Sequence, residues 1–69
     1  MSAFDNISNR EISELIDEWV HDERNRQILK DRYINGLLFN DLAEKYGLSV
    51  RHTQTIVYKA QKQLFKHIK

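Results

Sequence analysis

With 69 residues the chain has room for one domain, and a domain of this size buries only about 60% of the surface that its unfolded chain exposes. It contains no cysteine, which excludes a disulfide framework and a zinc site with thiolate ligands. The sequence has no apolar segment long enough to cross a bilayer and does not begin like a signal peptide, so we expect a soluble, cytoplasmic protein.

The net charge is only +1, but the charges are divided along the chain. Residues 1–23 hold seven acids and one base, a net charge of −6, whereas residues 24–69 hold ten bases and three acids, a net charge of +7. A division of this kind indicates one end that meets phosphate and another that avoids it or meets a basic protein surface. For the acidic end, the simpler interpretation is that the acids keep a helix soluble.

Apolar residues recur at helical spacing throughout, which predicts an all-α fold of four helices. The first is expected over Asn9–Val20, because Ser8 and Glu11 form a capping-box pattern before it. Its buried stripe comprises Ile12, Leu15, Ile16, Trp19 and Val20.

The second helix is expected over Glu23–Ile34. Asp22 precedes it as an N-cap, and Asn35 and Gly36 follow it in the manner of a glycine C-cap. Its inward residues are Ile28, Leu29 and Tyr33.

A short third helix is expected over Phe39–Tyr46. Leu38 stands where a capping side chain is usual, so this helix could instead begin later, at Asn40. The residues that should bury along its inner side are Phe39, Leu42 and Tyr46.

The fourth helix is expected to start after Ser49 as N-cap and to run to about His67. Early in it, Thr53 can face the core with its methyl group while its hydroxyl bonds a backbone carbonyl. Its other inward residues are Ile56, Val57, Ala60, Leu64 and Phe65.

The junction of the third and fourth helices has the spacing of a helix-turn-helix. Ala43 allows a second helix to approach closely, and Gly47 can take the left-handed conformation that ends a helix. Leu42, Tyr46, Leu48 and Ile56 are placed to bury between the two helices. This pattern predicts that the chain binds double-stranded DNA.

Residues 24–66 resemble, without a gap, the helix-turn-helix of region 4 in the sigma-70 family and the related LuxR-type domains. Mor-type phage activators, which share parts of the pattern, are a related alternative. The matching positions are Ile28-Leu29, Arg32-Tyr33, Gly36, Asp41-Leu42-Ala43, Tyr46-Gly47-Leu48-Ser49, Lys59-Ala60 and Leu64. Because residues 1–23 are too few to resemble the other regions of a sigma factor, the resemblance implies a small stand-alone regulator, for example of a phage or mobile element.

A helix that enters the major groove presents its first turns to base edges, while the preceding helix lies across the DNA backbone. Arg51 could bind guanine and Gln54 adenine, each with two hydrogen bonds. The resemblance puts base reading on the same early turns. The full set of expected base contacts is Val50, Arg51, His52, Gln54 and Thr55, and the expected phosphate contacts are Lys45, Ser49, Tyr58, Lys59 and Lys62.

Catalysis is not expected. His21, His52 and His67 are far apart in the sequence and lack the spacing of metal ligands on a helix. The chain has no glycine-rich phosphate loop and no nucleophile motif. We therefore predict no metal, no cofactor and no enzymatic activity.

The alternative is a protein-interaction module that binds RNA polymerase or another regulator through the acidic first helix. Its contact residues would be Glu14, Asp17, Glu18 and any exposed part of Trp19. A homodimer on paired half-sites is also possible, through the first helix or through Leu64, Phe65 and Ile68.

Overall fold

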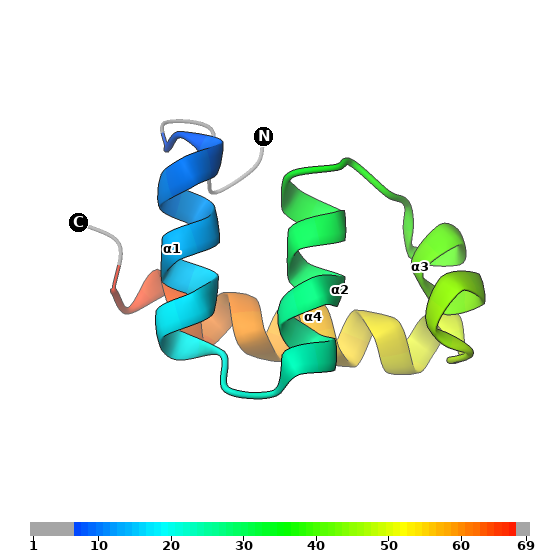
Figure 1. The fold of residues 1–69 in the computed structure, drawn as a ribbon. Coiled ribbons are helices and arrows are strands. Elements are labelled where there is room, and N and C mark those ends of the chain that lie inside the picture. Colours follow the sequence, from blue (N-terminus) through cyan, green and yellow to red (C-terminus); the bar gives the residue numbers. More distant parts are fainter. Residues whose placement is uncertain (1–6, 68–69) are drawn as a thin grey trace.

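The computed structural model describes residues 7–67, which form four helices and no strand. These are α1 (Asn9–Trp19), α2 (Glu23–Tyr33), α3 (Phe39–Tyr46) and α4 (Val50–Phe65). Helices α1 and α2 stand side by side, α4 crosses both, and α3 packs near the start of α4 (Figure 1). The expected all-α, four-helix class is confirmed. None of the helices in residues 7–67 has the length and apolar character that crossing a membrane requires.

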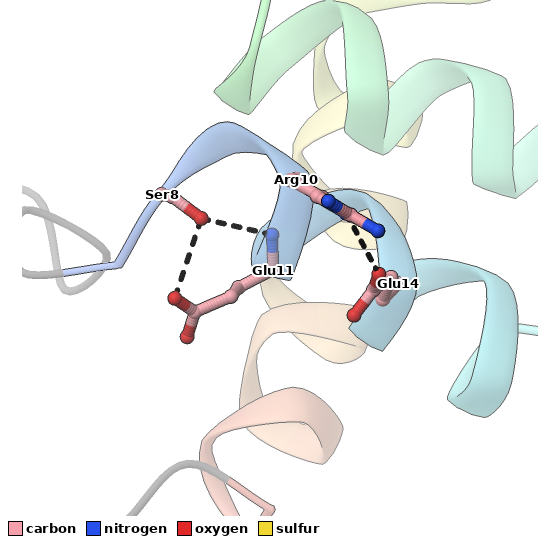
Figure 2. Close-up of polar contacts among 4 residues, drawn as sticks. All are labelled: Ser8, Arg10, Glu11 and Glu14. Atoms are coloured by element: carbon pink, nitrogen blue, oxygen red, sulfur yellow. Dashed lines mark hydrogen bonds and ion pairs between the residues drawn. The ribbon is translucent and has the colours of Figure 1, made fainter.

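Three of the four helices begin at the caps that the sequence predicts. The Ser8 hydroxyl accepts a hydrogen bond from the Glu11 N–H at 3.2 Å and donates one to the Glu11 carboxylate at 3.3 Å (Figure 2). Asp22 and Ser49 accept the corresponding bonds from Asn25 and His52, at 2.9 and 3.0 Å. Side-chain oxygens thus satisfy backbone donors that a helix start leaves unpaired.

Helix α3 spans Phe39–Tyr46, as expected, and does not begin at the alternative start, Asn40. Leu38 has no side-chain acceptor for the free backbone N–H groups of the first turn, but the Asp41 side chain reaches back to the residue before the helix. Its carboxylate accepts a hydrogen bond from the Leu38 backbone N–H at 3.2 Å. This is the second half of a capping box, and it places a negative charge at the positive end of the helix dipole.

Gly47 ends α3 with φ of 66° and ψ of 35°, the left-handed conformation that was predicted. Its N–H bonds the carbonyls of Ala43 and Glu44, and the Leu48 N–H bonds the Ala43 carbonyl at 2.9 Å. The six-residue span of the last bond is that of a Schellman motif. Three residues, 47–49, then separate α3 from α4.

All four helices contribute to one core. Its buried apolar residues are Ile12, Ile16, Val20, Ile28, Leu29, Leu42, Val57 and Leu64. Thr53 is fully buried beside them, and its hydroxyl donates to the Ser49 carbonyl at 2.9 Å, as expected. Helix α1 supplies two of these core residues, Ile12 and Ile16, and Val20 follows directly after it, so the acidic segment packs as part of the same body as the rest of the chain.

Phe65 is the main error in the predicted core, because its side chain is 39% exposed. Its neighbour Leu64 is fully buried. Successive residues on a helix point about 100° apart, and Leu64 already takes the direction that faces the other helices. The helix also ends at Phe65, two residues before the expected His67.

Candidate nucleic-acid interface

The outward face of α4 carries four of the ten residues expected to contact DNA. Arg51, Thr55, Tyr58 and Lys62 are all exposed. At about 100° per residue they lie opposite the buried Thr53, Val57 and Leu64. The face therefore combines two cations, a hydroxyl and an aromatic ring along three turns of one helix.

Tyr58 is 55% exposed, yet its ring is held in place. It meets the ring of Phe39 edge to face, with 5.6 Å between the centroids. The guanidinium of Arg32 lies over the ring of Phe39, 4.3 Å from the ring centre. Arg32 also donates a hydrogen bond to the Leu37 carbonyl at 3.0 Å. These contacts join α2, the start of α3 and the outward face of α4.

Three cations elsewhere in the fold pair with acids, whereas those of α4 do not within the described residues. Arg10 pairs with Glu14 at 3.4 Å, Lys30 with Asp17 at 2.7 Å and Lys45 with Asp31 at 2.7 Å. Within residues 7–67, no ion pair involves Arg51, Lys59 or Lys62. The positive charge of α4 is therefore available to an external anion.

Lys45 was expected to contact phosphate, but the structure places its ammonium against Asp31, which is only 5% exposed. Tyr46 and Asn35 also donate to this carboxylate, at 2.5 and 2.8 Å. The lysine side chain remains about half exposed. Its main role in the structure is to neutralise a buried acid, and a phosphate would compete with Asp31 for it.

Opposing effects set the pKa values in this cluster. Burial raises the pKa of Asp31, but hydrogen bonds from Lys45, Tyr46 and Asn35 and the lysine charge outweigh burial and hold the pKa below its usual value. Burial, together with the hydrogen bond to Asp31, raises the pKa of Tyr46 to about 12. Asp31 is therefore an anion, and Tyr46 a neutral donor, at neutral pH.

The remaining predicted DNA contacts lie around the start of α4. Val50 and His52 are exposed, whereas Gln54 is only partly exposed. The Ser49 hydroxyl caps the helix and the Thr55 hydroxyl donates to the Arg51 carbonyl at 3.0 Å, so both already have a partner inside the protein. Lys59 is exposed, and together with His52 it lines a hollow beside α4.

A hollow of about 490 Å³ lies between α4 and the turn that joins α1 to α2. His52, Thr55 and Lys59 line it from α4, opposite His21 and Arg24. Neither this hollow nor a role for Arg24 is predicted from the sequence. No local signal reveals it, because it depends on how the α1–α2 turn packs against a helix about 30 positions later.

The acidic residues of α1 form a separate exposed surface. Glu14, Asp17 and Glu18 are exposed, and only Glu18 lacks an ion-pair partner within the described part of the chain. Figure 2 shows the Arg10–Glu14 pair on α1, and both side chains are mostly exposed. Trp19 is half-buried and stacks on His67, with 3.5 Å between ring centres and 3° between the planes. Ile68, one of the suggested dimer contacts, lies outside the described residues.

No cluster of three or more histidine or acidic side chains in residues 7–67 is arranged to hold a metal ion. Comparison of the chain with protein-family models, with curated proteins and with solved structures gave no match.

Proposed function

We propose that this protein binds double-stranded DNA through a helix-turn-helix formed by α3 and α4, in the manner that the resemblance to sigma region 4 implies, and that it acts as a small transcriptional regulator. One observation carries the proposal: α4 follows a tight glycine turn and presents Arg51 and Lys62 outward without an ion-pair partner in residues 7–67. Exposed, uncompensated cations on such a helix suit a polyanionic groove.

In this proposal α4 enters the major groove with its first two turns. Arg51 binds a guanine edge, and Thr55 offers its methyl group to thymine because its hydroxyl is already used by the Arg51 carbonyl. Tyr58 and Lys62 lie further along the same face, where the helix meets the sugar-phosphate backbone. Helix α3 braces the reader through the Gly47 turn and through the Phe39–Tyr58 contact.

Duplex binding at several salt concentrations tests the proposal. Sequences selected from a random duplex pool supply the DNA, and the logarithm of the association constant should fall linearly with the logarithm of salt, with a slope of about 0.9 per phosphate neutralised. Lys62→Gln should reduce that slope by about 1 without changing the preferred sequence. Arg51→Ala should weaken binding to the selected site by about 1–3 kcal/mol and relax the preference at one base pair.

Arg10→Gln is the matched control, because Arg10 lies on α1 and pairs with Glu14. It should leave both affinity and slope unchanged. Absence of saturable binding to any selected duplex would rule out the proposed function, and an unchanged sequence preference in Arg51→Ala would rule out the assigned role of that residue.

A second candidate function is a protein contact through α1, to RNA polymerase or another regulator. What favours it is the exposed acidic row on α1, with Glu18 unpaired within the described residues. The double variant Glu14→Gln with Glu18→Gln should then lose binding to purified polymerase while its duplex affinity stays within about threefold of the parent. Equal polymerase binding by the parent and the variant would exclude this surface as the contact.

A further inference from the structure

The hollow beside α4 has the size and lining of a small-molecule site. Its volume of about 490 Å³ falls within the roughly 300–1,000 Å³ that is usual for ligand pockets. Its apolar lining comes from both walls: Trp19 and Val20 at the end of α1, and Ile56 and Ala60 on α4. A planar or aliphatic body could therefore leave water by packing between the two walls.

The charged residues that line the hollow carry a net positive charge. Arg24 on α2 and Lys59 on α4 both line it, and neither forms an ion pair within the described residues 7–67. The acid that lines it is Asp22, whose carboxylate caps α2 by accepting the Asn25 N–H at 2.9 Å. An anionic group in the hollow would thus meet two unpaired cations from opposite walls.

A third feature is an unsatisfied amide. Asn25 lines the hollow, and its Oδ1 is buried without a hydrogen-bond partner in the part of the chain that the structure describes. A buried acceptor without a donor is unfavourable, but the carboxylate of an anion has no proton to donate, so it can bond only the NH₂ group of this amide. Since Oδ1 has no donor to lose, the amide can also rotate to offer its NH₂ group without breaking a hydrogen bond of the oxygen.

We propose that this hollow binds a small organic anion with a planar apolar body, of the aromatic carboxylate class. The ring packs between the apolar side chains of the two walls, the carboxylate pairs with Arg24 and Lys59, and the Asn25 amide supplies a hydrogen bond. Because Thr55 lines the hollow and is also one of the proposed DNA contacts, the bound anion competes with DNA for α4. This last step rests on the proposed function, whereas the binding itself does not.

Binding is measured first without DNA, using 3-phenylpropionate as the probe. Trp19 is the single tryptophan of the chain and lines the hollow, so its fluorescence reports occupancy directly. We expect a saturable change with the acid, and binding at least about tenfold weaker with the neutral 3-phenylpropionamide, because a charge-assisted pair is lost. Arg24→Gln should weaken binding of the acid by a similar factor.

Arg24 is exposed, so Arg24→Gln should keep its helical circular dichroism and its melting temperature. The control Arg10→Gln also removes an exposed arginine, but at a position outside the hollow, and should bind the probe like the parent. The proposal is overturned if the fluorescence shows no saturation up to about 10 mM acid. It is equally overturned if the amide binds as tightly as the acid, or if Arg24→Gln binds the acid unchanged.

Competition is measured second, with the selected duplex. Saturating 3-phenylpropionate should lower the duplex affinity of the parent at least about fivefold and leave that of Arg24→Gln nearly unchanged. Unchanged duplex affinity in the parent would overturn the competition while leaving the binding site intact. If the parent binds the probe but no duplex, the proposed function and the competition fail together, and the site stands alone.

Discussion

At the scale of single residues, Asp31 has the strongest influence on local structure. It is almost fully buried in α2, and it accepts hydrogen bonds from Asn35, Lys45 and Tyr46. A buried carboxylate without partners would be strongly unfavourable, but three donors, one of them charged, satisfy this one. The cluster ties the end of α2 to the last turn of α3.

Asp31→Asn should lower the free energy of unfolding by about 1.5–3 kcal/mol at pH 7, because Lys45, Tyr46 and Asn35 lose a charged acceptor, while the half-exposed Lys45 ammonium stays solvated. In the parent, the pKa of Asp31 is lower in the folded than in the unfolded state. Its contribution is therefore fully present above the ordinary value of 3.8 and is lost as pH falls below it, through the folded-state pKa.

Urea titrations between pH 2 and 7 measure this effect. The difference in unfolding free energy between the parent and Asp31→Asn should shrink as the pH falls below about 4. Glu44→Gln is the control, since Glu44 is exposed on α3 and forms no ion pair in residues 7–67. A difference that stays constant across this pH range would contradict the role given to Asp31.

At the scale of elements, local signals predicted where helices start. Ser8, Asp22 and Ser49 act through backbone groups only three residues away, so the sequence contains the whole interaction. For α3 the sequence left Asn40 as an alternative start, because the capping interaction runs from the Asp41 carboxylate back to the Leu38 N–H. The ends of α1, α2 and α4 fall one or two residues short of expectation.

What the sequence could not supply is the pairing of distant side chains. Lys45 was assigned to phosphate because it is basic and lies on the bracing helix, but its partner Asp31 is 14 residues earlier and faces it only after α2 and α3 have packed. Apolar spacing alone predicts Phe65 in the core, but this spacing does not show where a helix extends past the helices that it packs against. The hollow, too, exists only in the assembled fold.

Gly47→Ala isolates the cost of the left-handed turn. A Cβ at this position would have no atom within 4 Å, so the substitution changes only backbone strain at φ of 66°. The free energy of unfolding should fall by about 1–2 kcal/mol, measured by urea titration. Asn40→Ala, at an exposed position on α3, should change it by less than about 0.5 kcal/mol. Equal effects of the two substitutions would argue against a strained turn.

At the scale of the whole molecule, α1 and the helix-turn-helix share one hydrophobic core. Ile16 on α1 is fully buried in the same cluster as Leu42 on α3 and Val57 on α4. The end of α1 also meets the end of α4 through the Trp19–His67 stack. The charge division along the chain therefore separates two surfaces of one body.

Ile16→Val tests this unity. It should lower the free energy of unfolding by about 0.5–1.5 kcal/mol, because one methylene leaves a filled site. Helix content by circular dichroism and the environment of Trp19 by fluorescence should give coincident melting curves in both the parent and the variant. A fluorescence transition that precedes the loss of helix content would show that α1 detaches separately.

The brevity of α3 has a consequence for binding. A helix of eight residues is too short to persist in water by itself, so α3 remains folded only while Leu42 stays buried and the Asp31 cluster stays closed. We therefore expect any opening of α3 to require the loss of both contacts. Molecules in which α3 is open should not bind DNA, so the apparent affinity should fall in proportion to the fraction of molecules that remain closed. Protonation of Asp31 enlarges the population with α3 open, so acid should weaken DNA binding before it melts the other three helices.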